Sequence, residues 1–346
     1  GEVLAPLPTF STGAKVRVAV TCLLFLSSAC CNGAVLWAVA TARGRRWPRV
    51  RLLVANLAGA DLLVTVVVMP LDATWNVTLQ WHGGEAACRA LMFLKLAAMY
   101  ASAFLTVVIA LDRHAAIVTP LAASRGSKAM LGTAWALSGL LALPQAFIFR
   151  TVRCSWPRPF VQCATVGSFG ARWQETLYNL FTFSCLFLLP LLAMGLCYGH
   201  ILATISGRMK EGDGEGLGSS RRFQLRRSCD RIPRARLRAL RMSFLIVLTF
   251  ILCWTPYYLL GLWYWFSPEM LTRQKVPSSL SHILFLFGLF NTCLDPLVYG
   301  LFTVPFRRDL GSCRCAQSRA QRRAHGPELT TTTTTLVASS ARASSG

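Results

Sequence analysis

The sequence has few charged residues, and acidic residues are fewer than basic ones. Only 14% of its 346 residues are Asp, Glu, Lys or Arg, whereas soluble domains usually carry about 25%. Acidic residues number 14 against 36 basic ones, which gives a formal net charge of +22. The shortage of charge is concentrated in long apolar runs, and this distribution indicates membrane spans rather than a soluble domain.

Several chemical signatures are also absent. The thirteen cysteines include no CxxC pair and no zinc spacing, and the chain has no HExxH, GxSxG or Walker pattern. We therefore expect no enzyme, no cofactor and no metal-ligand cluster. The sequence has no internal repeat, which argues against an inverted-repeat transporter. Its last apolar run has no lysine, so it lacks the residue that would bind retinal as a Schiff base.

Seven apolar runs are each long enough to cross a hydrocarbon layer of ~30 Å, which takes about 20 helical residues. We expect helices, because an isolated strand in lipid would leave its backbone groups unpaired. The predicted fold is an all-α membrane protein with a seven-transmembrane bundle at 16–303. The predicted spans are about 16–42, 50–74, 88–118, 127–149, 174–205, 236–266 and 277–302.

The regions around this bundle have their own expected roles. Residues 1–15 should form the extracellular N-terminus; the first residue is glycine, which leaves room for a longer natural N-terminus. Residues 304–314 are expected to form a short amphipathic helix at the membrane surface. Residues 315–346, which include a run of threonines, are expected to be a disordered cytoplasmic tail.

The basic residues give the orientation of the bundle. With the N-terminus outside, 26 basic residues fall on the inner side and nine on the outer side. Eleven of the inner ones lie in the third inner loop, residues 206–241. Cytoplasmic loops carry this excess in membrane proteins. The net charge is thus explained by topology, and we expect no nucleic-acid partner.

Ionisable side chains within the spans are costly and usually functional. Lys95 lies seven residues after Cys88, about 10 Å into the membrane at 1.5 Å per residue. Snorkelling from that depth is difficult, so a ligand-facing or ion-paired role is favoured. Asp72 lies near the outer end of the second span, where we favour a site role over a solvated acid.

Asp61 and Asp295 lie in the middle of the second and seventh spans. If the two carboxyl groups face each other, they would bind a sodium ion or hold a proton between them. Structural hydrogen bonding inside the bundle explains them equally well, and the two interpretations are compatible.

Aromatic residues cluster in the sixth span, at 254–258 and 263–266. An interfacial aromatic belt accounts for Trp263 and Trp265. It does not account for Trp254 and Tyr257, which lie deeper and next to Pro256. The deeper pair is therefore a candidate for ligand contact.

The predicted outer face carries Cys88 and Cys163, and an oxidising compartment favours a disulfide between them. Cys154 lies in the same loop as Cys163 and competes for that pairing. Asn76-Val77-Thr78 is the only glycosylation sequon. It is so close to the membrane that we do not expect a glycan on Asn76.

Short motifs recur in order along all seven spans, and together they resemble the fingerprint of rhodopsin-like G-protein-coupled receptors. The motif residues are Asn32, Leu57 to Asp61, Leu111-Asp112-Arg113-His114, Trp135, Asn291 and Asp295-Pro296-Leu297-Val298-Tyr299. Longer matches resemble the gonadotropin-releasing hormone receptors over residues 14–312: Met69 to Asp72 with Trp75-Asn76, Tyr178-Asn179, and Cys253 to Phe266. The long tail and Asp at both 61 and 295 resemble the type II receptors.

The resemblance implies a multi-pass plasma-membrane receptor for a decapeptide with a pyroglutamyl N-terminus and an amidated C-terminus. It implies ligand binding by Arg17, Asp72, Asn76, Lys95, Asn179, Trp254, Tyr257, Tyr258 and Tyr264. It implies activation and G-protein coupling through Asp61, Asp112, Arg113, Asn291, Asp295, Pro296 and Tyr299. The implied partners are Gq/11, which activates phospholipase C and calcium signalling, arrestin through the tail, and membrane lipids.

Departures from the family pattern refine this expectation. His114 stands where the wider family has Tyr, and Asp295 where most members have Asn. The third outer loop, 272–281, has no acid, which favours the type II hormone with Tyr in place of Arg. The alternatives are a vasopressin/oxytocin-like peptide receptor and, with less support, a transporter that uses Asp61 and Asp295.

Overall fold

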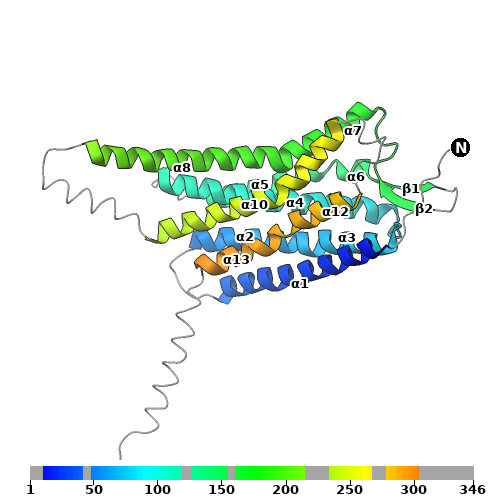
Figure 1. Cartoon of the computed structure of the whole chain (residues 1–346), viewed down its shortest axis with the longest axis horizontal. Coiled ribbons are helices and arrows are strands. Elements are labelled where there is room, and N and C mark those ends of the chain that lie inside the picture. Colours follow the sequence, from blue (N-terminus) through cyan, green and yellow to red (C-terminus); the bar gives the residue numbers. More distant parts are fainter. Residues whose placement is uncertain are drawn as a thin grey trace, which may run out of the picture. The chain divides into compact units, whose positions relative to one another are not determined.

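The computed structural model describes residues 11–41, 48–118, 126–154, 160–214, 234–266 and 278–303. Within these ranges, seven helices are long and apolar enough to cross a membrane (Figure 1). This confirms the predicted all-α, seven-helix fold. The interfacial helix expected at 304–314 and the tail at 315–346 lie outside the described residues.

Three spans are continuous helices and four are segmented. The continuous ones are α1 (Thr12–Thr41), α4 (Gly84–Val118) and α10 (Arg234–Phe266). The second span consists of α2 (Pro48–Leu63), the π-helix η1 (Val64–Val68) and α3 (Met69–Thr78). The fourth is α5 (Ser127–Ala142) followed by α6 (Gln145–Ile148). The fifth is α7 (Arg172–Phe183), the π-helix η3 (Ser184–Leu188) and α8 (Leu189–Gly214). The seventh is α12 (Ser278–Leu289) and α13 (Asn291–Thr303).

Prolines mark the irregular points of the spans. A proline has no backbone N–H and its ring clashes with the carbonyl four residues earlier. The π-helical turns η1 and η3 end just before Pro70 and Pro190, where they relieve this clash with one extra residue. Pro144 separates α5 from α6, whereas Pro256 and Pro296 lie inside α10 and α13.

The third span, α4, lies at the centre of the bundle and contacts α2, α5, α8 and α10. Its small residues Ala98, Ala101 and Ala103 are buried, which lets neighbouring helices approach closely. Large apolar side chains on the outside of the bundle, such as Trp37 and Leu196, are exposed. An apolar exterior of this kind suits a lipid environment.

A two-stranded hairpin is attached to the outer end of the bundle. Strand β1 (Arg150–Cys154) pairs antiparallel with β2 (Phe160–Ala164). The disulfide Cys88–Cys163 joins β2 to α4, which confirms the predicted pairing. Trp81 donates its backbone N–H to Val161 at 2.8 Å, and Glu85 accepts from the backbone N–H of Thr151 at 2.7 Å. The hairpin is therefore fixed to the outer ends of the second and third spans.

Candidate functional site

Side chains from α1, α3 and α12 meet at the outer end of the bundle. Arg17 donates from Nε to Oδ1 of Asn76 at 3.1 Å and from Nη1 to Oγ of Ser279 at 3.3 Å. Asn76 donates in turn to Oδ2 of Asp72 at 3.3 Å and to its backbone carbonyl at 2.8 Å. The side chain of Asn76 is thus buried and fully engaged in a polar chain that joins three spans.

Asp72 and Lys95 bring opposite charges to this outer end. Asp72 interacts electrostatically with Lys95, His282 and Arg17. The side chain of Lys95 is half-buried, and its ammonium lies 5.1 Å from the ring centre of Phe285, a distance that suits cation–π attraction. Lys95 therefore lies within electrostatic reach of Asp72 and beside an aromatic ring. Its contact with a ligand stays a prediction.

The deeper aromatic residues of α10 pack inside the bundle. Tyr258 stacks on Phe187 of η3 with ring centres 4.6 Å apart, and Tyr257 lies 5.5 Å from Phe285. Trp254 contacts both tyrosines, at 6.2 and 6.0 Å. The rings of these three α10 residues therefore pack against one another and against neighbouring spans inside the bundle.

The two outer tryptophans of α10 behave differently from each other. Trp263 is 56% exposed, as expected of a belt residue. Trp265 instead packs edge-on against Phe183, with ring centres 6.2 Å apart. Trp265 is half-buried and faces α7, so only Trp263 is open to the surroundings, and a belt position for the two residues stays a prediction.

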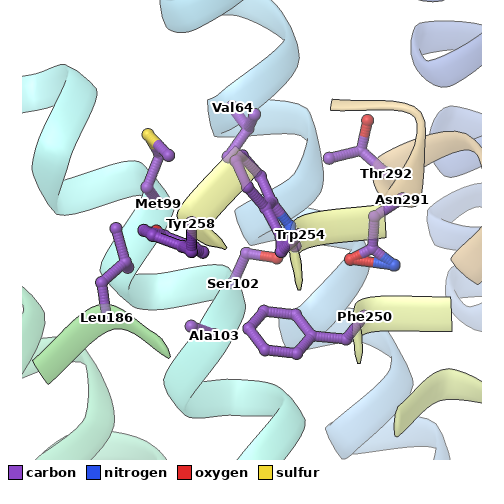
Figure 2. Close-up of a pocket in the computed structure, with 10 residues that line it drawn as sticks. All are labelled: Val64, Met99, Ser102, Ala103, Leu186, Phe250, Trp254, Tyr258, Asn291 and Thr292. Carbon is purple, nitrogen blue, oxygen red and sulfur yellow. The ribbon is translucent and has the colours of Figure 1, made fainter. Parts of the chain in front are cut away.

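A small cavity lies between the aromatic residues and the middle of the bundle (Figure 2). Its volume is about 20 Å³, enough for one water molecule. Figure 2 shows Trp254 and Tyr258 on its wall together with the polar side chains of Ser102, Asn291 and Thr292. The cavity is therefore a mainly apolar chamber with a few polar side chains on its wall, and it lies directly beside the aromatic residues that are candidates for ligand contact.

Two of these polar side chains are hydrogen-bonded to buried carboxyl groups. Ser102 donates to Oδ1 of Asp61 at 2.9 Å, and Asn291 donates to Oδ1 of Asp295 at 3.3 Å. Both aspartates are fully buried, and they lie close enough to interact directly. Their Oδ2 atoms have no hydrogen-bond partner among the described residues. Two buried carboxylates cannot both stay charged without a counter-ion, so this pair suits a shared proton or a small cation.

At the inner end of α4, Asp112 and Arg113 form an ion pair. Asp112 also accepts a hydrogen bond from Oγ of Ser127 at 3.0 Å, which ties α4 to α5. The side chain of Arg113 is only 11% exposed. The structure therefore holds this arginine against its own neighbour rather than open to the inner surface.

Other predicted residues are less fully placed. Asn179 is half-buried on α7, next to Tyr178, whose hydroxyl accepts a hydrogen bond from Gln145 at 2.6 Å. Tyr264 and Tyr299 belong to α10 and α13, but their side chains lie outside the described part of the chain.

Sequence reasoning missed three residues of α12: Ser279, His282 and Phe285. They are spaced three apart and contact or interact with Arg17, Asp72 and Lys95. Residues three or four apart share a helix face. That spacing was the available signal, because Ser279 and His282 are polar residues on one face at the start of a largely apolar helix.

The family described as 7 transmembrane receptor (rhodopsin family) matches residues 31–299 of the chain. The chain is similar to a gonadotropin-releasing hormone II receptor of Callithrix jacchus, at 64% identity over 87% of this chain and 79% of that protein. It is also similar to the gonadotropin-releasing hormone II receptor of Clarias gariepinus, at 52% identity over 89% of this chain and 81% of that protein. The gonadotropin-releasing hormone receptor of Sus scrofa is 45% identical over 86% of this chain and 92% of its own length.

Proposed function

The chain belongs to the rhodopsin family of seven-transmembrane receptors and, within it, to the gonadotropin-releasing hormone receptors, and from this premise we propose that it binds such a hormone at its outer end and activates a G protein at its inner end. It is a multi-pass protein of the plasma membrane. Its relatives are receptors and not enzymes.

The observation that supports hormone binding best is the convergence of Arg17, Asn76, Asp72 and Lys95 beside the aromatic cluster of α10. A peptide with blocked ends offers amide donors, carbonyl acceptors and aromatic rings but no terminal charges. Asn76 and Arg17 match amide and carbonyl groups, and Trp254 and Tyr257 match the rings. The hormone would replace some of the present hydrogen bonds of this chain rather than fill an empty polar site.

The route inward begins at Trp254, which contacts the tyrosines on one side and lines the cavity on the other. Ser102 and Asn291 connect that cavity to Asp61 and Asp295. A hormone that favours another position of Trp254 would change the cavity and the occupancy of the carboxyl pair. It can shift the receptor only by its difference in affinity for the two states.

At the inner end, activation would release Arg113 from Asp112 and open a cleft for a G-protein helix. We propose coupling to Gq/11, with phospholipase C and calcium signalling downstream. The basic residues at 234–241, which form the inner end of α10, would contact lipid phosphates and the G protein. Arrestin would bind the Ser/Thr-rich tail.

Inositol-phosphate accumulation in cells tests this proposal, with both hormone forms as ligands. We expect a response that favours the type II hormone, because residues 272–281 contain no acid to attract an arginine. Lys95→Gln should abolish most of it, whereas Lys15→Gln should not. Lys15 is an exposed lysine at the outer end of α1, so it controls for the change in charge. No response from a receptor confirmed at the cell surface would contradict the hormone assignment or the Gq/11 coupling.

A further inference from the structure

Two histidines meet at the inner ends of the third and fifth spans, away from the hormone site. Nε2 of His114 lies 2.8 Å from Nδ1 of His200, and the ring centres are 4.9 Å apart. His114 belongs to α4 and His200 to α8, two helices that run side by side (Figure 1). The contact therefore joins two spans through one pair of imidazoles.

This geometry is close to what a transition metal needs. Zinc binds imidazole nitrogen at about 2.0–2.1 Å, so two nitrogens of a tetrahedral site lie about 3.3 Å apart. The observed pair needs to open by only about 0.5 Å to reach that spacing. Each ring would carry its proton on its other nitrogen. We propose that His114 and His200 form a two-imidazole site for a divalent transition metal such as zinc, nickel or copper.

The surroundings determine what kind of site this is. His200 is exposed and His114 half-buried, so solvent reaches the pair and water can fill the remaining coordination positions. The adjacent acid, Asp112, is already bonded to Arg113 and Ser127. No group of three or more His, Cys, Asp or Glu side chains suited to a metal is found in the parts of the chain that the structure describes. The site therefore binds reversibly, more weakly than a structural four-ligand site.

Metal binding here would act on the coupling machinery. His114 directly follows Arg113, and His200 lies two residues after Tyr198, which interacts electrostatically with Arg113. A metal bound to both rings ties α4 to α8 in the arrangement in which Arg113 is paired with Asp112. It therefore stabilises that arrangement and opposes release of Arg113. This consequence rests on the proposed function, whereas the metal site itself does not.

The first experiment measures binding of Zn²⁺ to the full chain in zwitterionic lipid nanodiscs, after accessible thiols have been alkylated. We expect one site that weakens at least about tenfold in both His114→Ala and His200→Ala, since even outer-shell partners of a metal site contribute about 10–100-fold. His82→Gln, an exposed histidine outside this pair, should bind as the parent does. An unchanged helical circular dichroism spectrum and thermal midpoint show that each variant is folded. Equal Zn²⁺ affinity in the parent and both alanine variants would overturn the proposal.

The second experiment measures hormone-stimulated nucleotide exchange on Gq in the same nanodiscs, with and without Zn²⁺. We expect Zn²⁺ to reduce exchange by the parent receptor and to have no effect on the double variant His114→Ala/His200→Ala, which also controls for direct action of zinc on the G protein. Equal inhibition of both receptors would contradict the inference that a metal bound to His114 and His200 inhibits coupling by holding α4 against α8. Histidine-dependent Zn²⁺ binding by a receptor that gives no hormone response would contradict the proposed function and leave the metal site supported.

Discussion

Gly288 of α12 lies directly against the indole of Trp254. A Cβ atom at position 288 would meet two ring carbons of Trp254 at 2.6 Å, far inside normal contact. The indole of Trp254 can occupy its present position only because residue 288 of the seventh span is a glycine and has no side chain.

Replacing Gly288 with alanine should displace Trp254. Overpacking of a well-filled interior typically costs about 1–3 kcal/mol, so we expect a lower Tm of the hormone-free receptor and a weaker hormone response. Gly139→Ala, where a Cβ would meet nothing within 4 Å, is the matched control. Adding Trp254→Phe to Gly288→Ala should recover part of the lost stability, because the smaller ring makes room. A Tm equal to that of the parent would show that the ring moves aside freely.

The disulfide Cys88–Cys163 should be needed for hormone binding more than for the helical bundle. Native disulfides in small secreted domains contribute about 2–5 kcal/mol, and here the loss would fall on the outer hairpin. We expect Cys163→Ala to lower hormone affinity by roughly tenfold or more while the chain still inserts in the membrane. Radiolabelled hormone binding to surface receptor measures this effect. Cys22→Ala, an exposed cysteine outside any disulfide, should bind as the parent does.

The carboxyl pair should make hormone binding sensitive to sodium. A cation held by Asp61 and Asp295 stabilises the hormone-free state, so affinity should be lower in NaCl than in choline chloride, by about fivefold or more if the coupling is of typical size. Asp61→Asn keeps an acceptor for Ser102 but removes one charge, and it should abolish the salt effect. Equal affinities of the parent in the two salts would contradict a sodium ion and favour the shared proton. Ion flux that depends on Asp61 would instead support the transporter alternative.

Asn76 should carry no glycan although it begins a sequon. Its side chain is 8% exposed and bonded to Arg17 and Asp72. Treatment of the surface receptor with an N-glycosidase should therefore leave the electrophoretic mobility of this chain unchanged. A shift that disappears in Asn76→Gln would contradict the buried placement. The same variant should also weaken hormone binding, since it removes the residue that links the first and second spans.

The spans and their orientation could be predicted because lipid imposes simple constraints on length, polarity and loop charge. Charged residues such as Lys95 and Asp61 also stood out, since their cost in lipid is independent of their neighbours. Their partners could not be predicted in the same way. The contact between Arg17 and Asn76 depends on how α1 and α3 are rotated about their axes, and hydrophobic runs do not encode that rotation.

The fine structure of the spans was equally hidden in the sequence. The antiparallel strands Arg150–Cys154 and Phe160–Ala164 were not predicted, because a few β-branched residues in a loop do not show which segment they pair with; the disulfide and Glu85 fix their position. The close approach at Gly288 depends on a residue in another span. A glycine within an apolar run has no visible role until its neighbour is known.

The π-helical turn η1 separates the buried carboxyl group of Asp61 from the hormone-site residues Asp72 and Asn76. A π-helical turn holds its extra residue locally, so loss of one residue from Val64–Val68 would restore a regular α-helical turn and bring back the clash of Pro70 with the carbonyl four residues earlier, while the outer third of the span keeps its facing. Asp61 would keep its place. The extra residue of this turn therefore lets a proline stand in the second span without rotating Asp72 and Asn76 away from the mouth of the bundle, and it keeps the hormone-facing and buried halves of the span in phase.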